Sequence, residues 1–325
     1  MFLESTATGD PAASCAAEPT RNLLIVHTPP YQGLSDWQDV KQRIEARAPD
    51  IEVRIATNGS PNSVTGRWQI RRPSMVFSVS PLFQFKPKGG TVYSGHPMSK
   101  FEQIERLASN GFPIPRTARL APDLVLDRET WGRYVVLKPW DGWMGEDVRL
   151  LRTEDVAAHY SELTFDGKRP MVIQPYIEHS EDGYPTECRV LSMFGRVLYC
   201  ARNRWGAARR PLEEIASDPN GIIASNDKTF GRVRTVCDDP EIIALGVRAH
   251  SAFPECPTVA VDIIRNADTG QLCIMEANPE GLSWHFSSVL SGTFTAEHIR
   301  DLYSQFNALD RVAELLIEKT RAEAT

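Results

Sequence analysis

One short segment of the chain, Asp262 to Pro279, carries two acidic residues at mirrored positions. Asp262 and Glu276 each lie seven residues from Thr269, and the apolar runs on either side of a polar turn predict a β-hairpin. A hairpin centred on Thr269 places the two carboxylates opposite each other, with Cβ atoms roughly 5 Å apart, and Asn278 on the same face. Close carboxylates repel unless a hard divalent cation such as Mg²⁺ binds them. The segment therefore predicts a cation site; two solvated carboxylates at a sheet edge are the alternative.

Length and charge restrict the class of protein. The chain has 325 residues, 42% of them hydrophobic, so it is long enough for more than one packed domain. Its formal net charge is -6 and it has no run of basic residues, which argues against a nucleic-acid partner. No stretch approaches the roughly 20 apolar residues of a membrane helix, so no membrane partner is expected.

The cysteines and the N-terminal residues bear on location. Six cysteines occur without a closely spaced pair, which favours reduced thiols over a zinc site or a disulfide framework. Residues 1–20 lack the basic start and apolar centre of a signal peptide, so they are expected to be a disordered tail. A cytoplasmic location is the default expectation, and a homodimer is the default oligomer.

Residues 21–96 are expected to form a small open α/β domain. Apolar or alternating runs at 22–27, 51–55 and 74–79 predict strands, and helical spacing at 36–48 predicts a helix. The first strand runs into Pro29 and Pro30 where dinucleotide-binding folds carry glycines, so a nicotinamide cofactor is not expected. Ser99 is the expected N-cap of a helix that begins at Lys100, close to the start of the next domain.

The rest of the chain, 97–325, alternates hairpins and helices in a pattern typical of an α+β domain. The expected fold class is thus an open α/β unit followed by an α+β unit. Residues 209–236 are rich in turn-forming residues and are expected to be an insertion. One last helix is expected from about Ala296 to near the C-terminus.

Lys138 ends a predicted strand and precedes a turn that contains Gly142 and Gly145. Glycines let backbone amides approach an anion closely, and a lysine adds a compact positive charge for phosphate oxygens. The segment predicts a phosphate-binding loop, with an ordinary hairpin loop and an exposed lysine as the alternative.

The segment from Gln174 to Glu181 leaves a predicted strand through Pro175, which is typical of a strand end or edge. Its exposed backbone can present amide and carbonyl groups to the edge of a base, and Glu181 can bind ribose hydroxyls. A simple acidic loop is the alternative.

A second hairpin is predicted from Glu187 to Arg204, with a two-residue turn at Phe194 and Gly195. That register would put Glu187, Arg189 and Arg202 on one face, with Arg204 continuing it. Arginines so placed bind phosphate or carboxylate oxygens through forked hydrogen bonds, and surface ion pairs with Glu187 are the alternative.

Together these segments resemble the ATP-grasp superfamily from about Pro97 to Ile317. The most specific likeness is Val261 to Arg265 followed by Ile274 to Pro279, because members use the corresponding Asp, Glu and Asn as Mg²⁺ ligands. Residues 21–96 resemble the pre-ATP-grasp domain that usually precedes this fold.

The resemblance implies two α+β subdomains that clasp ATP, with 97–170 as a small lid-bearing part and 171–325 as the metal, ATP and substrate part. It implies Mg²⁺ or Mn²⁺ at Asp262, Glu276 and Asn278. It implies ATP contacts from Lys100, Lys138, Gly142, Gly145, Gln174, Tyr176, Ile177 and Glu181. It implies that Arg189, together with Arg202 or Arg204, neutralises the transferring phosphate and the intermediate.

The activity implied by the resemblance is that of an ATP-dependent carboxylate–amine ligase. A carboxylate attacks the γ-phosphate to give an acylphosphate, and an amine captures the acyl group with release of phosphate. Two alternatives remain: a phosphotransferase whose product keeps the phosphate, and a nucleotide-binding protein without turnover. The chain departs from the family pattern after Asn278, at Glu280 to His285, where substrate contacts are expected.

Overall fold

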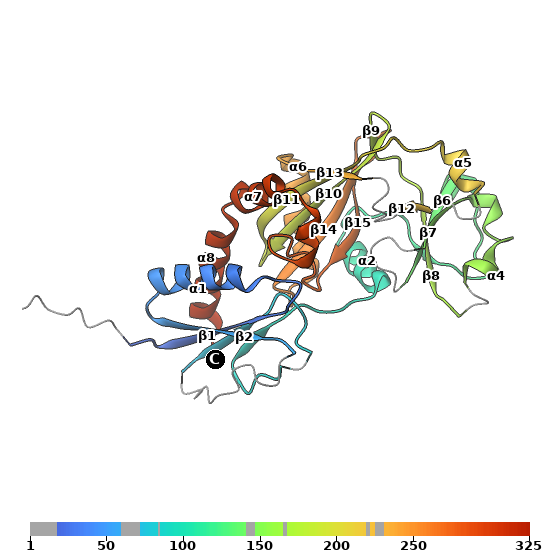
Figure 1. Cartoon of the computed structure of the whole chain (residues 1–325). Coiled ribbons are helices and arrows are strands. Elements are labelled where there is room, and N and C mark those ends of the chain that lie inside the picture. Colours follow the sequence, from blue (N-terminus) through green and yellow to red (C-terminus); the bar gives the residue numbers. More distant parts are fainter. Residues whose placement is uncertain are drawn as a thin grey trace, which may run out of the picture.

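The computed structural model describes residues 18–59, 72–83, 85–140, 147–164, 168–218, 222–224 and 231–325. Three sheets follow one another across the molecule (Figure 1), and the largest lies between the other two. No helix among these residues is long and apolar enough to cross a membrane.

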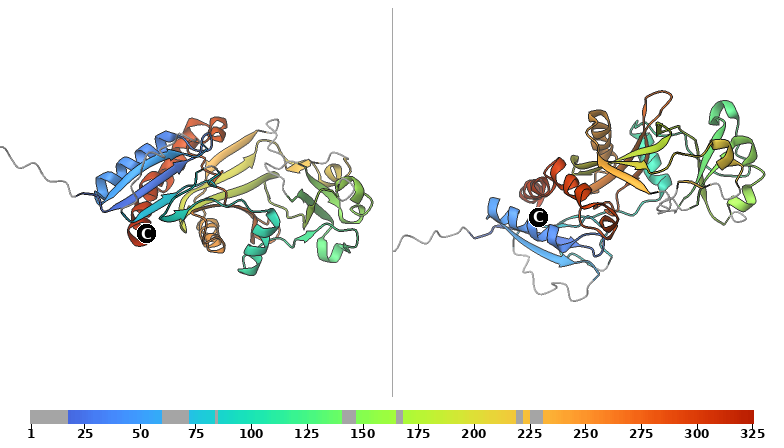
Figure 2. Two further views of the ribbon diagram at one scale, coloured as in Figure 1. Left: turned by 90° about the horizontal axis from the view of Figure 1, so that it is seen from below. Right: turned by 45° about the horizontal axis from the view of Figure 1, so that its top comes forward.

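The N-terminal unit is a four-stranded parallel sheet in the order β2-β1-β3-β4. Its strands are β1 (Arg21–His27), β2 (Ile51–Thr57), β3 (Ser74–Phe77) and β4 (Thr91–Tyr93). Helix α1 (Leu34–Arg47) packs on one face beside α8 (Ala308–Glu323), so the two ends of the chain share one core (Figure 2). Trp37 and Leu316 are fully buried in it. The strands and the helix expected in this region are therefore present.

The C-terminal region departs from the expected single helix. It forms α7 (Ala296–Gln305) and α8, separated at Asn307, whose φ of 51° lies in the left-handed region. An asparagine tolerates that conformation better than most residues, and it ends the regular helical path.

The large sheet is antiparallel and has the strand order β13-β11-β10-β14-β15, with β9 added at the end of β10. The strands are β9 (Ser180–Glu181), β10 (Tyr184–Met193), β11 (Arg196–Trp205), β13 (Arg232–Val236), β14 (Thr258–Arg265) and β15 (Leu272–Asn278). Helix α6 (Pro240–Ala249) covers one face, and η3 (His250–Ala252) follows it. A Cβ at Gly246 would lie 2.5 Å from that of Val190, so this helix sits unusually close to β10.

A third sheet has the order β12-β7-β6-β8-β5 and lies beyond the large one (Figure 1). Its strands are β5 (Ala118–Arg119), β6 (Tyr134–Pro139), β7 (Val148–Arg152), β8 (Met171–Pro175) and β12 (Ile222–Ala224). The short helices around it are α3 (Arg128–Trp131), η1 (Thr153–Asp155), α4 (Tyr160–Leu163) and α5 (Leu212–Ala216).

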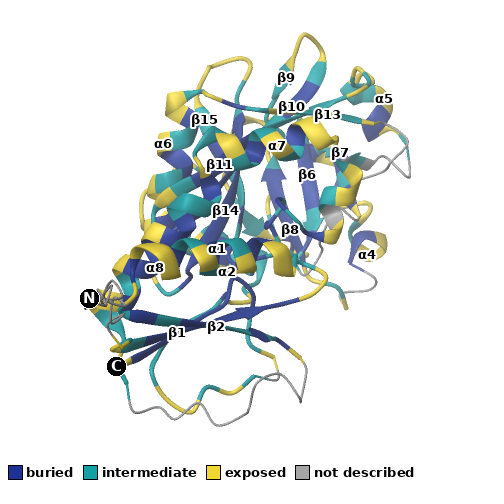
Figure 3. Ribbon diagram, turned by 60° about the vertical axis from the view of Figure 1, so that its left-hand side comes forward, coloured by how far each residue is buried: buried dark blue, intermediate teal, exposed yellow. Residues whose placement is uncertain are grey.

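Helix α2 (Lys100–Ser109) lies between the N-terminal unit and this sheet, and Ser99 caps it as expected. Burial follows the layers, because the sheets are mostly buried and the outer sides of the helices are exposed (Figure 3).

The hairpin β10–β11 turns at Phe194 and Gly195, which both have positive φ, so the predicted two-residue turn is confirmed. A β-bulge follows between Leu191 and Ser192. Beyond it Arg189 pairs with Ala201, and Arg202 pairs with Cys188. The prediction that Arg202 and Arg204 share a face with Arg189 is wrong, because the extra residue of a bulge moves every later side chain to the other face.

The hairpin β14–β15 places Asp262 opposite Glu276, as expected. A bulge next to Asp262 makes this pairing possible, since Ile263 pairs with Ile274 rather than with Met275. Without the bulge, Asp262 would lie opposite Met275, and Glu276 would point to the other face.

A single carboxylate joins the N-terminal unit to the loop that follows β15. Asp36 of α1 is 4% exposed and accepts hydrogen bonds from Trp284 (2.7 Å), Ser287 (2.5 Å) and Tyr303 (2.7 Å). The same loop approaches the end of β3 so closely that a Cβ at Gly281 would lie 1.8 Å from the Val79 carbonyl oxygen. The N-terminal unit therefore fixes the loop that begins just after Asn278.

Candidate active site

Asp262 and Glu276 are each paired with a basic side chain. Arg189 donates two hydrogen bonds to Asp262, from Nε to Oδ1 (2.6 Å) and from Nη2 to Oδ2 (2.7 Å). The ammonium group of Lys100 pairs with Glu276. Asn278 Nδ2 lies 3.4 Å from Asp262 Oδ2, so the three residues predicted as metal ligands lie together.

Burial strengthens the Arg189–Asp262 pair. Asp262 is 7% exposed, and its strand partner Arg189 is partly buried. Burial alone would lower the pKa of Arg189, but the charge and hydrogen bonds of Asp262 outweigh it and raise that pKa. The guanidinium is therefore charged at any accessible pH.

The donor set suits a hard divalent cation. Asp262 and Glu276 offer carboxylate oxygens, and the amide of Asn278 offers a third oxygen once its orientation is reversed. Within the described ranges no group of three or more His, Cys, Asp or Glu side chains could hold a metal, and this set has only two acids. Mg²⁺ commonly completes its coordination with water and phosphate oxygens, so a small protein set with a bound nucleotide fits it.

The two predicted phosphate lysines approach the same place from different elements. Lys100 is the first residue of α2 and Lys138 lies near the end of β6. Burial is the main cause that lowers the pKa of Lys138, and the charge of Lys100 adds to it, while Glu276 and Asp262 oppose it. The lysines and the two acids therefore lie within electrostatic range of one another. Gly142 and Gly145 lie outside the described residues.

An aromatic stack links the two lysine-bearing elements. Phe101 follows Lys100 and stacks on Trp140, with ring centroids 5.5 Å apart. The guanidinium carbon of Arg119 lies 4.5 Å from the Phe101 ring centroid and 4.3 Å from that of Trp140. Arg119 was not predicted as a site residue, because a lone arginine on a short edge strand has no recognisable sequence pattern.

The predicted adenine hinge is held from both sides. The Gln174 side chain is 1% exposed and donates to Thr117 Oγ1 (2.9 Å). Arg209 donates to the Tyr176 hydroxyl and pairs with Glu178 at 2.6 Å. Burial raises the pKa of Tyr176, so its hydroxyl stays protonated. Arg209 comes from the predicted insertion, which explains why sequence spacing did not connect it with the hinge.

Glu181 lies in β9, one residue before the turn formed by Asp182 and Gly183. Its carboxylate lies 3.3 Å from Arg202, and the guanidinium of Arg204 stacks on Tyr184 at 3.9 Å. Arg202 and Arg204 therefore support the predicted ribose-binding turn rather than the Arg189 face. The His179 side chain contacts the backbone of Ile177, because its Nδ1 lies 2.9 Å from the Ile177 carbonyl oxygen.

Arg234 of β13 is a further residue on this face that was not predicted from the sequence. It pairs with Asn203, which pairs with Glu187, so it shares a face with Arg189. Its guanidinium lies 4.5 Å from the Phe294 ring centroid. The spacing of Arg232 and Arg234, two residues apart, could have indicated a strand with both arginines on one face. The surrounding turn-forming residues instead favoured an insertion.

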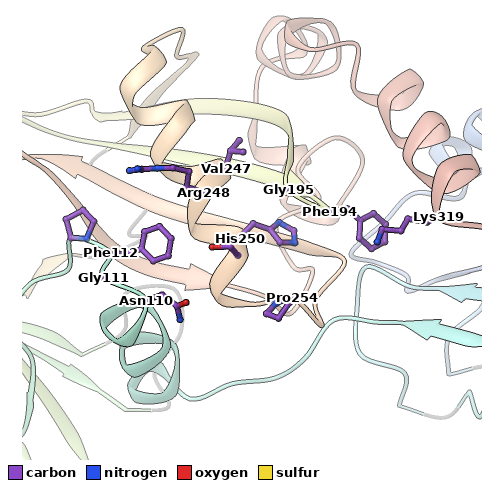
Figure 4. A pocket seen from close by; sticks show the side chains of 12 residues that line it. Asn110, Gly111, Phe112, Phe194, Gly195, Val247, Arg248, His250, Pro254 and Lys319 are labelled. Atoms are coloured by element: carbon purple, nitrogen blue, oxygen red, sulfur yellow. The ribbon is translucent and has the colours of Figure 1, made fainter. Parts of the chain in front are cut away.

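A cavity of about 570 Å³ lies elsewhere, between the end of α2, the segment around η3 and the β10–β11 turn (Figure 4). His250 at its wall is already bonded, with Nδ1 2.8 Å from Ser192 Oγ and Nε2 3.0 Å from the Cys256 carbonyl. None of the predicted site residues lines this cavity, so it is separate from the site on the Asp262 face.

Comparisons with known proteins identify the fold. No protein-family model and no curated protein matches the chain. Solved structures do match. D-cycloserine synthetase DcsG has 18% sequence identity to the chain and a TM-score of 0.52, over 90% of this chain and 99% of that one. The ATP-grasp ligase PsnB complexed with minimal precursor has 16% identity and a TM-score of 0.56, over 93% of this chain and 100% of that one.

The macrocyclase MdnC from Microcystis aeruginosa, bound with precursor peptide MdnA, also matches. It has 15% identity and a TM-score of 0.53, over 91% of this chain and 99% of that one. The chain has the ATP-grasp fold, as the resemblance in its sequence implied. At these identities the likeness establishes the fold alone.

Proposed function

We propose that the protein is an ATP-dependent ligase that activates a carboxylate as an acylphosphate and joins it to an amine, with release of ADP and phosphate. The observation that carries this proposal is the charge row Arg189, Asp262, Glu276 and Lys100 on one face of an ATP-grasp sheet. The similar structures support it, because they include a synthetase, a ligase bound to a precursor and a macrocyclase bound to a peptide.

Asp262, Glu276 and Asn278 would hold Mg²⁺ or Mn²⁺, which would neutralise the phosphate oxygens of ATP. Lys100 and Lys138 would bind phosphate oxygens, and Gln174, Tyr176, Ile177 and Glu181 would hold adenine and ribose. Arg189 would stay bound to Asp262 and present its remaining N–H groups to the transferring phosphate. Arg189 would thus put positive charge at the place where negative charge develops.

In the first step a carboxylate oxygen attacks the γ-phosphorus, and the bond from that phosphorus to ADP breaks. In the second step the amine nitrogen attacks the acyl carbon, the bond to the phosphate oxygen breaks, and the amine proton goes to solvent or phosphate. The protein contributes positioning and electrostatics, since neither step needs a covalent bond to a side chain.

The test is a screen for ADP release with Mg²⁺ and a panel of carboxylates, with hydroxylamine as the acceptor. With hydroxylamine present, activation of a carboxylate gives ADP, phosphate and a hydroxamate in equal amounts. Without hydroxylamine and with an amine supplied, a ligase releases phosphate and forms an amide, whereas a phosphotransferase gives ADP and a phosphorylated product without free phosphate. Asp262→Asn and Glu276→Gln should each lose metal-dependent nucleotide binding. Asp268→Asn, in the exposed turn of the same hairpin, is the matched control. Unchanged metal-dependent binding in both site variants would refute the metal assignment.

A further inference from the structure

Arg234 is a partly buried cation without an ion-pair partner among the described residues, and Glu187 acts on it only through its charge. It makes no hydrogen bond with any residue that the structure describes, and its guanidinium lies over the ring of Phe294. The neighbouring arginines both have acidic partners: Arg189 makes two hydrogen bonds with Asp262, and Arg232 lies 3.6 Å from Glu187. A charge removed from water without a partner is costly, so a guanidinium in this position suits an anionic ligand.

The position of Arg234 separates it from the metal site. Strand β13 lies three strands from β14, and strands in a sheet are about 4.8 Å apart, so the backbones of Arg234 and Asp262 are separated by roughly 14 Å. The reacting oxygen must come within about 3.5 Å of the γ-phosphorus, next to Asp262 and Glu276. An anion on Arg234 at the far side of the face is therefore a different group from the one that is activated.

The wall between the two arginines is aromatic and uncharged. The His285 ring stacks on Tyr199 (5.9 Å) and meets Phe294 edge-on (5.3 Å). Burial, with the charges of Arg189 and Arg234, lowers the pKa of His285 well below its usual range, so the imidazole is neutral at pH 7. No hydrogen bond joins its ring nitrogens to the described residues, which leaves them for a ligand. His285 thus offers a hydrogen bond beside Arg234 without adding charge.

We propose that Arg234, with His285 beside it, binds a substrate carboxylate that is not the one activated by ATP. This inference rests on the proposed ligase function. The carboxylate belongs either to an acid substrate with two carboxylates or to an amine substrate that is an amino acid. In either case, one of the two substrates carries an anionic carboxylate that takes no part in the reaction.

The inference is tested by calorimetric binding to the whole protein with ADP and Mg²⁺ present. Glutarate is compared with butyrate for the acid source, and glycine with glycinamide for the amine source. Either glutarate should bind at least about tenfold more tightly than butyrate, or glycine should bind at least about tenfold more tightly than glycinamide. A charge-assisted hydrogen bond to the additional carboxylate contributes that much. Arg234→Gln should remove the difference, Arg234→Lys should keep part of it, and Arg248→Gln, an exposed arginine on α6, should leave it unchanged.

The inference is overturned if neither pair shows a preference, if no probe binds, or if the preference survives in Arg234→Gln. Nucleotide binding and thermal unfolding of that variant show that it is folded. Binding does not require turnover, so its outcome is separate from that of the ligase assay. A binding preference without ADP release would refute the ligase function and support the carboxylate site. ADP release without a binding preference would support the ligase function and refute the carboxylate site.

Discussion

Arg189 and Asp262 are directly paired across β10 and β14, and two hydrogen bonds of 2.6 and 2.7 Å join their side chains. The pair holds one predicted metal ligand in place while it keeps an arginine beside the expected phosphate. Structure and chemistry therefore depend on the same contact.

Breaking this pair should destabilise the fold. Arg189→Gln leaves the Asp262 carboxylate mostly buried without its cation, which is expected to lower the free energy of unfolding by about 3 kcal/mol. Urea unfolding measures the change. The double variant Arg189→Gln with Asp262→Asn should be more stable than Arg189→Gln alone, because it removes the uncompensated charge. Equal stability of the wild type and Arg189→Gln would contradict this assignment.

Much of the Asp262 face could be predicted from the sequence, because strand periodicity is local. The turn residues and alternating runs identified the two hairpins, and the Asp262–Glu276 pairing followed from their spacing. The two bulges could not be predicted, since a bulge depends on how neighbouring strands pack. One bulge preserved the expected pairing of Asp262, whereas the other moved Arg202 to the opposite face from Arg189.

Residues that act across long sequence separations were also missed. Arg209 reaches the hinge, and Arg234 reaches the Arg189 face, from a segment whose turn-rich composition predicted an insertion. In the sequence, Asp36 is an ordinary acid in the first turn of a helix. It is buried because the N-terminal unit packs against the loop after Asn278. Tertiary contacts of this kind have no local sequence pattern.

Nucleotide binding should weaken as pH rises through the alkaline range. Burial lowers the pKa of Lys138, so this lysine loses its proton at a lower pH than an exposed lysine does. Its charge favours phosphate binding only while protonated, so the affinity for ATP is highest below that pKa and falls above it. Equilibrium binding of ATP across pH 6 to 10 measures the effect. Lys138→Arg should bind with little pH dependence over this range, because arginine stays charged.

Arg209 should position the nucleotide hinge. Its side chain pairs with Glu178 and donates to Tyr176, and both partners lie in the segment expected to contact adenine. Arg209→Ala should weaken ATP binding by about tenfold, because the loss of a charge-assisted hydrogen bond frees the hinge. Arg210→Ala is the matched control, since Arg210 is exposed and lies 3.6 Å from Asp218 on the surface. The same loss of affinity in both variants would show that Arg209 has no particular role.

Asp36 should couple the N-terminal unit to the site. Three donors from the loop after β15 and from α7 converge on its carboxylate, so Asp36→Ala leaves Trp284, Ser287 and Tyr303 without their acceptor. The expected loss is about 2 to 4 kcal/mol in the free energy of unfolding, because buried donors are left unsatisfied. Asp36→Asn keeps one acceptor oxygen and should lose less. Asp39→Ala, a partly exposed acid on the same helix paired with Arg43, is the control and should change stability by under about 1 kcal/mol. If Asp36→Ala proves no more harmful than this control in urea unfolding, the carboxylate does not hold the two units together.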